Sequence, residues 1–289
     1  MKQCCKIYAF SLCLFLLFSV FIIVSVAPLL QQAVEPIDEA IGKGYRFLVS
    51  NLWDEERGAY RECPPSNPEG KDKNYWGDDN YLAYIFHSEY PSFKDETKAQ
   101  RILLYLRTNP PYLERGKQHW VVLSRNYTQF SPYNDNEYAD KVALDGIYYA
   151  KSGAIEKARE RFNYLILKMY NSSVGLIEDK ATLKNGHEYY KLGLALILAV
   201  HLKNSTYAEA FVYKLLKLQR ADGSWLTDDL DQETTYPNTE TTIIILIALT
   251  TYQEWCYSPP PNPLLVIVAL VILALCIYVL FELFRRRHK

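Results

Sequence analysis

The stretch 215–229, LLKLQRADGSWLTDD, constrains the fold most, because it shows how one helix ends and what comes next. Its apolar helical face ends near Gln219. The pair Asp222-Gly223 then predicts a turn, since glycine adopts a positive φ at little steric cost. Trp225 follows at once and is too large and apolar to stay in solvent. We therefore expect Trp225 to fold back onto the helix that it has just left.

Two long apolar runs, residues 7–27 and 264–284, lie near the ends of the 289-residue chain. Each is long enough to cross a bilayer core of about 30 Å as a helix. The second run is followed by the basic residues 285–289, so we expect a transmembrane helix with a cytoplasmic tail. The first run is either a signal anchor within residues 1–30 or a signal peptide removed after Ala27.

Both alternatives export residues 31–257, which we expect to form one extracellular domain at the cell membrane. A proline-rich segment at 258–263 predicts an extended stalk between this domain and the second span. Residues 28–263 carry a net charge of about −6, which argues against a nucleic-acid partner. Three sequons fit an exported domain and are candidate glycosylation sites: Asn126, Asn171 and Asn204.

Two cysteines, Cys63 and Cys256, lie in the predicted exported domain. In an oxidising compartment they could form one disulfide between the beginning and the end of the domain. The alternative is a pair of buried thiols, and we favour the disulfide.

Eight helical segments are predicted from apolar residues spaced three and four apart. Residues 153–170 have a single apolar stripe, which includes Ala158 and Phe162. Residues 192–200 and 243–249 are apolar all round, which indicates burial on every side. The predicted helices are 36–53, 79–90, 93–106, 137–152, 153–170, 187–201, 207–220 and 239–255, with a short strand at 119–123.

The alternation of one-sided and fully buried helices predicts an all-α fold with two concentric layers. Turns of similar sequence follow three of the amphipathic helices and begin at Gly58, Gly175 and Gly223. Recurring turns of this kind indicate repeated helical hairpins.

The segment around Gln219, Gly223 and Trp225 resembles the Gln-Trp repeat of the squalene cyclase and protein prenyltransferase superfamily. The fold of that superfamily is an α/α toroid of inner and outer helices. Lys214 stands where the repeat has an aromatic residue. The resemblance implies a partial toroid of about eight helices, and it gives the three matching residues a structural role in joining neighbouring hairpins.

The catalytic motifs of that superfamily do not occur in this sequence. Residues 228–231, Asp-Asp-Leu-Asp, reverse the order of the acid motif of the cyclases. The zinc ligands of the prenyltransferases and the Cys-Gly-Glu-Gln thioester motif have no counterpart. We therefore expect no metal ion and no cofactor, and a terpenoid-cyclase-like enzyme acting on lipid is the weakest of three functional alternatives.

Polar residues gather where each predicted inner helix begins, and in a toroid these starts share one rim. Four carboxylates there, Asp79, Asp140, Glu188 and Glu240, are candidate catalytic acids, because paired carboxyl groups cleave glycosidic bonds as acid and base. Acids at helix N-termini also stabilise a helix by about 0.3–1 kcal/mol each without any catalytic role. Candidate ligand-binding residues beside them are Trp76, Asp78, Asn80, Tyr138, His187 and Tyr189.

The sequence thus favours a membrane-anchored toroid domain that binds glycan or protein ligands at an acidic and aromatic rim. The alternative is a glycan-processing hydrolase or lyase that uses the rim carboxylates.

Overall fold

The computed structural model describes residues 36–65, 73–113, 118–126, 130–181, 186–230 and 235–257. Both predicted membrane segments, the stalk and the basic tail lie outside these ranges. Among the described residues, no helix combines the length and the apolar character that a bilayer span needs. The chain divides into two compact units, Met1–Tyr252 and Gln253–Lys289, and the architecture below belongs to the first.

The described chain is mostly helical, as the apolar spacing predicts. Residues 36–47 are helical and continue as a π-helical turn, η1 (Leu48–Leu52). The α-helices that follow are α2 (Gly77–Glu89), α3 (Glu96–Leu106), α4 (Ala139–Lys151), α5 (Ile155–Lys168), α6 (Tyr189–His201), α7 (Ser205–Leu218) and α8 (Thr239–Cys256). The short elements are the 3₁₀ helices η3 (Pro91–Phe93) and η4 (His119–Leu123), and the strands β1 (Trp53–Asp54), β2 (Ala59–Tyr60), β3 (Tyr170–Asn171) and β4 (Leu176–Ile177).

One prediction of local structure is wrong. Residues 119–123 form the 3₁₀ helix η4 and not a strand, because a short apolar run does not distinguish a strand from a helical turn. Two helices begin with a side-chain cap. Asp95 caps α3 by accepting the amide of Lys98 at 2.9 Å, and Asn204 caps α7.

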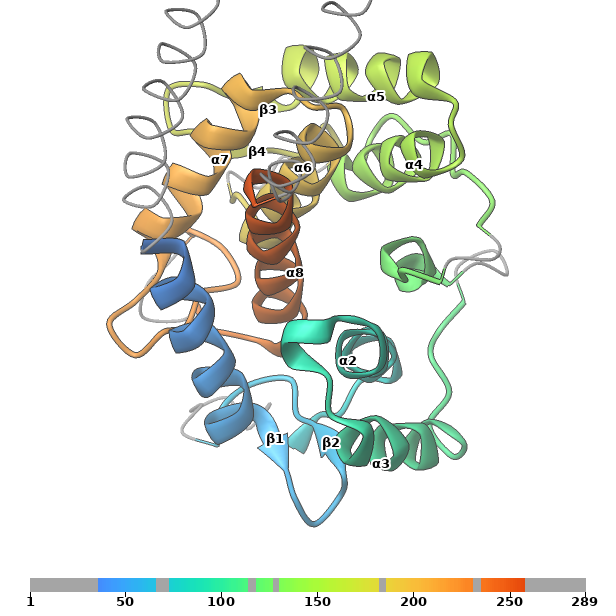
Figure 1. Ribbon diagram of the computed structural model, residues 1–289, viewed down its shortest axis with the longest axis vertical. Coiled ribbons are helices and arrows are strands. Elements are labelled where there is room, and N and C mark those ends of the chain that lie inside the picture. The colour runs from blue at the N-terminus through green and yellow to red at the C-terminus, as the bar shows by residue number, and fades with distance from the viewer. Residues whose placement is uncertain are drawn as a thin grey trace, which may run out of the picture. The chain divides into compact units, whose positions relative to one another are not determined.

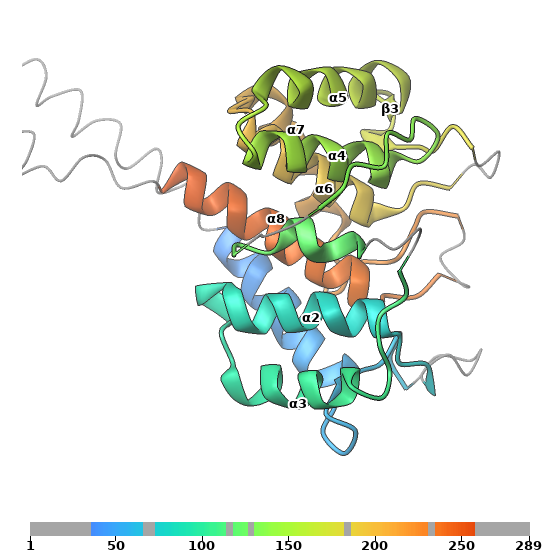
Figure 2. The same cartoon turned by 90° about the vertical axis from the view of Figure 1, so that its right-hand side faces the viewer.

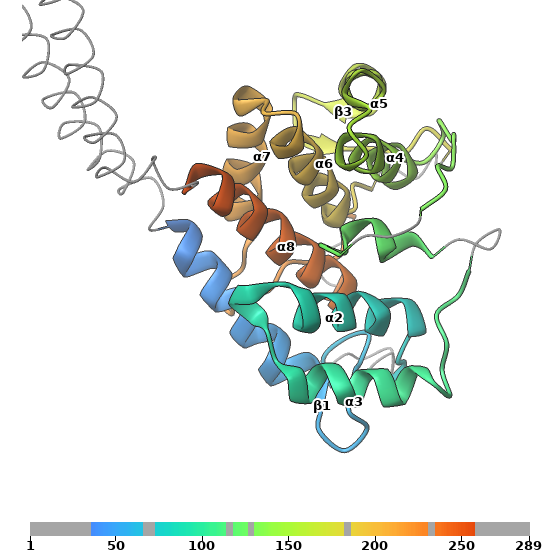
Figure 3. The same ribbon diagram turned by 45° about the vertical axis from the view of Figure 1, so that its right-hand side comes forward.

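The helices are arranged as hairpins in two layers. Contacts pair α2 with α3, α4 with α5 and α6 with α7, as Figure 1 shows. The outer helix α5 buries only the stripe of Ala158, Phe162 and Leu165, whereas every residue of α6 from Tyr189 to Val200 is buried. Figure 3 shows α8 between α6 and α2, and α4 contacts α6. The inner layer is therefore α2, α4, α6 and α8, which is the arrangement of an α/α toroid.

The Gln-Trp segment joins the last hairpin to the first helix. Gln219 Nε2 donates to the carbonyl oxygen of Ala40 at 2.8 Å. The Trp225 ring packs so closely on the first helix that a Cβ on Gly44 would lie 2.5 Å from it, and 3.1 Å from Leu246 of α8. The helix at 36–47 therefore lies against both α8 and the turn after α7, and it completes the outer layer.

Turns that share a sequence pattern also share a geometry. Gly58, Gly175 and Gly223 have φ angles of 66°, 73° and 90°, a region that other residues adopt only with strain. Gly58 lies between the paired strands β1 and β2, and Gly175 between β3 and β4. Each turn follows an outer helix and leads the chain back towards the start of an inner helix.

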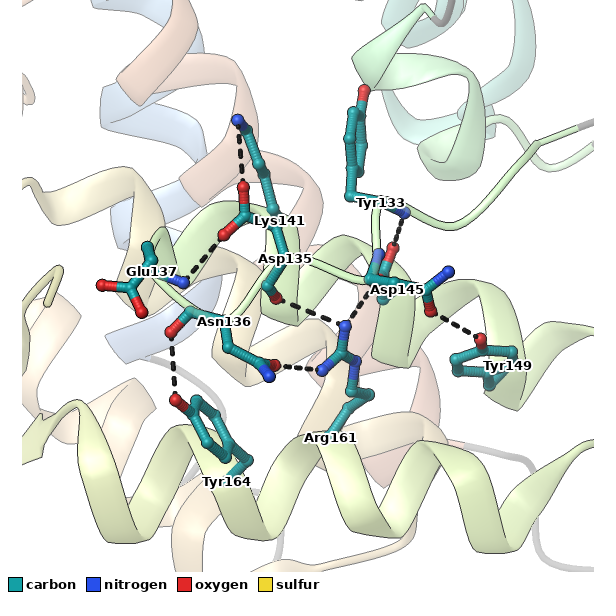
Figure 4. Close-up of polar contacts among 10 residues, drawn as sticks. Tyr133, Asp135, Asn136, Glu137, Lys141, Asp145, Tyr149, Arg161 and Tyr164 are labelled. Atoms are coloured by element: carbon teal, nitrogen blue, oxygen red, sulfur yellow. Dashed lines mark hydrogen bonds and ion pairs between the residues drawn. The ribbon is translucent and has the colours of Figure 1, made fainter. Parts of the chain in front are cut away.

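A buried carboxylate fixes the loop that leads into α4 (Figure 4). Asp145 accepts the backbone amides of Tyr133 at 2.7 Å and Asn134 at 2.8 Å. Its second oxygen also accepts from Arg161 of α5 at 2.7 Å. The other arm of Arg161 donates to Asn136 Oδ1 at 2.5 Å. One fully enclosed acid thus holds the loop, α4 and α5 together.

Candidate functional site

The inner helices all begin on one side of the first unit. Figure 2 shows that the loops leading into α2, α4, α6 and α8 lie together on that side. Each helix brings an acidic side chain within its first turn or at its N-cap. We call this set the acidic rim, and its members are Asp78, Asp79, Asp140, Glu188 and Glu240.

Electrostatics show that the rim acids act on one another. The pKa of Glu240 is raised well above its usual value, first by burial and then by the negative charges of Asp79 and Glu188. The charges of Asp140 and Asp78 raise it further. Like charges disfavour ionisation only at short range, so the four inner helices bring these acids together.

Asp79 and Glu240 both have raised pKa values. Burial, and then the charges of Glu62 and Asp78, raise the pKa of Asp79 to about 7. Among the described residues, no donor forms a hydrogen bond to the carboxyl group of Asp79 or Glu240. Asp79 is only 8% exposed, yet neither carboxyl belongs to the described polar groups that are fully enclosed without a hydrogen-bond partner. The oxygens of both acids therefore keep some access to solvent at the rim.

A lysine lies among the acids of α4 and α6. Lys191 Nζ lies 2.7 Å from Asp179 Oδ2 and also contacts the carboxylate of Glu188. Burial raises the pKa of Asp140, while the charge of Lys191 and the Lys141 amide oppose that rise. The acids on this side of the rim thus have a cation beside them.

Aromatic side chains surround the acids. Trp76 and Tyr138 occupy the N-cap positions of α2 and α4, where neither forms a side-chain capping hydrogen bond. Trp76 is 55% exposed and Tyr138 is 38% exposed. Tyr190 is buried, and its pKa is raised well above its usual value by burial and then by rim charges, that of Asp140 first. Trp120 of η4 packs edge-on against Tyr190, with ring centroids 6.4 Å apart.

Asn80 was predicted to bind a ligand, but the structure gives its side chain another role. It is fully buried, and its Oδ1 accepts the amide of Tyr60 at 2.7 Å. Its Nδ2 donates to the carbonyl oxygens of Tyr60 and Trp76, both at 2.9 Å. Asn80 therefore joins β2 to α2 and fixes the backbone beneath the exposed Trp76 ring.

His187 and Tyr189 were also predicted to bind a ligand, and both are engaged within the protein. His187 Nδ1 lies 2.8 Å from Asp229 Oδ2, and its Nε2 lies 2.7 Å from Glu178 Oε1. Tyr189 is buried, and its backbone amide donates to the Thr227 carbonyl at 2.9 Å. These contacts tie the loops before α6 and after α7 to each other.

The other predicted sites are the cysteines and the sequons. Cys63 is buried and Cys256 is exposed, and their disulfide stays a prediction for an oxidising compartment. Asn126 is exposed, Asn171 Nδ2 donates to Glu178 and Asn204 caps α7. Their glycosylation stays a prediction. Among the described residues, no group of three His, Cys, Asp or Glu side chains is arranged to hold a metal ion.

The sequence analysis missed Lys191 and Asp179. Lys191 directly precedes the apolar run that identifies α6, and a charged residue there needs a buried partner. Lys191 could therefore have been found from the sequence. Asp179 could not, because its role depends on a turn that brings it to the start of α4. There its Oδ1 accepts the Ala139 amide at 2.7 Å.

No protein-family model matches the sequence, and no curated protein matches it. Two similar solved structures are the GH76A alpha-1,6-mannanase from Salegentibacter sp. HEL1_6 and an inactive variant of that enzyme in complex with alpha-1,6-mannotriose. Each is 11% identical, with 76% of this chain and 99% of that chain covered, at a TM-score of 0.41. Neither is a terpenoid cyclase or a prenyltransferase, and similarity this weak supports no inference about activity.

Proposed function

We propose that this domain is a glycan-processing hydrolase whose catalytic groups are the carboxyls of the acidic rim. The observation that carries the proposal is the pair Asp79 and Glu240. Asp79 is buried and Glu240 half-buried, both have raised pKa values, and neither accepts a hydrogen bond from the described residues. Perturbed acids that stabilise nothing around them are typical of active sites. From the sequence alone we favoured a binding module. The raised pKa values of Asp79 and Glu240 are the reason to favour a hydrolase instead.

Glycoside hydrolysis needs one carboxyl group that is protonated and one that is ionised, and we assign these roles to Glu240 and Asp140. Glu240, whose pKa is raised by burial and by the charge of Asp79, is the acid that donates its proton to the glycosidic oxygen as the C–O bond breaks. Asp140, beside the Lys191 charge, is the carboxylate that takes a proton from water while the water oxygen bonds to the anomeric carbon. The net reaction consumes one water molecule.

Trp76 and Tyr138 are the surfaces on which sugar rings would stack. Helix N-caps favour Ser, Thr, Asp and Asn, whose side chains accept a backbone amide. Aromatic rings at both positions give no such hydrogen bond and stay substantially exposed. A rigid ring beside an acid suits a ligand that offers both C–H faces and hydroxyl groups.

A binding module without turnover is the second candidate, because the same exposed rings favour glycan binding whether or not a bond is broken.

Glu188 is the least available of the four predicted catalytic acids, because its carboxylate pairs with Lys191. No observation favours the lipid-processing alternative.

The test is a hydrolysis screen of the full-length chain against α- and β-linked oligosaccharides, read as new reducing ends. Loss of a general acid typically lowers the rate about 10²- to 10⁴-fold, so we expect Glu240→Gln to reduce kcat/KM by that factor while calorimetry still detects binding. Glu209→Gln, on the exposed face of α7, is the matched control and should leave the rate unchanged.

Three outcomes separate the candidates. Cleavage that survives both Glu240→Gln and Asp79→Asn removes this pair from the mechanism. Binding that requires Trp76 and occurs without cleavage of any substrate favours the binding module. Neither binding nor cleavage across the panel overturns the glycan proposal.

A further inference from the structure

Lys191 is a buried cation in an otherwise apolar helix. Its side chain is 5% exposed, and the residues of α6 that follow it, Leu192 to Val200, are apolar and buried. Removing an ammonium group from water is costly unless charged partners surround it. Asp179 and Glu188 are those partners, and both face the start of an inner helix.

Asp179 connects Lys191 to the beginning of α4. Its Oδ2 lies 2.7 Å from Lys191 Nζ, and its Oδ1 accepts the backbone amide of Ala139 at 2.7 Å. The next residue along α4 is Asp140. A single carboxylate therefore fixes the position of the lysine charge relative to a proposed catalytic acid.

The two sides of the rim differ in what lies beside each acid. Lys191 pairs with Glu188 from its own helix and is linked to α4 by Asp179. Among the described residues, no cation forms an ion pair with Asp79, Asp140 or Glu240, so Lys191 acts on Asp140 across Asp179 rather than by direct contact. The rim is thus divided into a side with a fixed cation and a side without one.

We propose that Lys191 is a positioning residue that keeps Asp140 ionised as the catalytic carboxylate and leaves the proton on the Asp79 and Glu240 side. This inference rests on the proposed hydrolase function. It goes further by assigning the division of roles between the two sides to one side chain that does not touch the substrate.

The charges that act on Asp140 come from four elements. Burial is the largest cause and raises the pKa of Asp140, and the charge of Asp179 raises it too. Lys191 of α6, the Lys141 amide of α4 and His119 of η4 oppose that rise. Asp140 in turn raises the pKa of Tyr190 and Glu240. Lys191 is the first of the groups that favour the ionised form, so its removal should have the largest effect.

The first experiment needs no turnover. Carboxyl ¹³C NMR of the full-length chain, labelled at Asp and Glu, follows each rim acid through a pH titration. In the wild type we expect Asp140 to lose its proton at a lower pH than Asp79 and Glu240. In Lys191→Gln we expect the Asp140 transition to move up by about one pH unit or more. An Asp140 that titrates last in the wild type overturns the proposal, even if the variant does not fold.

The second experiment uses activity to separate charge from packing. A catalytic carboxylate must be ionised, so a higher pKa of Asp140 moves the acidic limb of the kcat/KM profile to higher pH. Lys191→Gln should show that shift. Lys191→Arg, which keeps the charge, and Lys168→Gln, on the exposed end of α5, should not. An equal shift in Lys191→Arg would contradict the charge argument.

A failed proposal for Lys191 and a failed hydrolase proposal give different results. If no glycan is cleaved but the NMR order and its response to Lys191→Gln are as expected, the division of charge holds and the hydrolase proposal fails. If glycans are cleaved and the Asp140 titration ignores Lys191, the hydrolase stands and the role of Lys191 is withdrawn.

Discussion

Two buried carboxyl groups of this protein, Asp145 and Asp79, have opposite surroundings. Asp145 is fully enclosed and accepts two backbone amides and the Arg161 guanidinium (Figure 4). Asp79 is 8% exposed, receives no hydrogen bond from the described residues and has its pKa raised to about 7. A buried acid with donors stabilises a fold, whereas one without them destabilises it. The difference separates an acid that builds the toroid from one that we assign to its chemistry.

The largest expected effect tests the structural acid. In Asp145→Asn the amide nitrogen must face backbone N–H groups, and Arg161 loses its ionic partner. Breaking a buried ion pair by changing one member typically costs about 3–5 kcal/mol. Urea unfolding of the full-length chain at pH 7 should show that loss. Glu156→Gln, which changes an exposed ion pair of α5, is the control and should change stability by less than about 0.5 kcal/mol. A loss equally small at Asp145 would remove the contrast.

The same substitution at Asp79, Asp79→Asn, should stabilise the folded protein above neutral pH instead of destabilising it. The folded-state pKa of about 7 lies above the ordinary value of 3.8, so the folded protein binds this proton more tightly than the unfolded chain. The resulting stability is present below pH 4 and is lost as pH rises through 7, by up to about 1.4 kcal/mol per pH unit. Asp79→Asn removes this loss.

Unfolding at two pH values tests this expectation. At pH 8 the variant should be more stable than the wild type by up to about 4 kcal/mol, and at pH 4 the two should differ little. The Glu240→Gln variant should change stability in the same direction, because burial and the Asp79 charge raise the pKa of Glu240. A destabilised Asp79→Asn at both pH values would place Asp79 with Asp145 as a structural acid.

The layers of the toroid could be predicted from the sequence, because the pattern of apolar residues in a helix shows how much of its surface is buried. A single stripe in α5 and an apolar sequence all round α6 determine which helix is outer and which is inner. The positions of Asp79 and Glu240 at the starts of helices could also be predicted from the sequence. Trp225 was assigned to a turn between hairpins for the same reason: its neighbours along the chain define its surroundings.

Partnerships between distant residues could not be predicted. Asn80 looks like a rim residue by its position, yet its partner Tyr60 lies 20 residues earlier in a two-residue strand. His187 is held by Glu178 and by Asp229, which is 42 residues later. Such pairs depend on how loops fold back, and helical periodicity carries no information about them. The sequence therefore located the rim but could not separate its bound residues from those facing outward.

The smallest expected effect tests whether Asp145 stabilises the fold independently of Asn136. Asn136 is exposed and accepts from Arg161 at 2.5 Å, so Asn136→Ala should cost about 1 kcal/mol or less by itself. If Asn136 matters only because it orients Arg161 towards Asp145, the same change in an Asp145→Asn background should cost nearly nothing. A double-mutant cycle by urea unfolding measures that coupling. Full additivity would mean that the Asp145 cluster is a set of independent contacts, and that Asp145 differs from Asp79 only in its immediate donors.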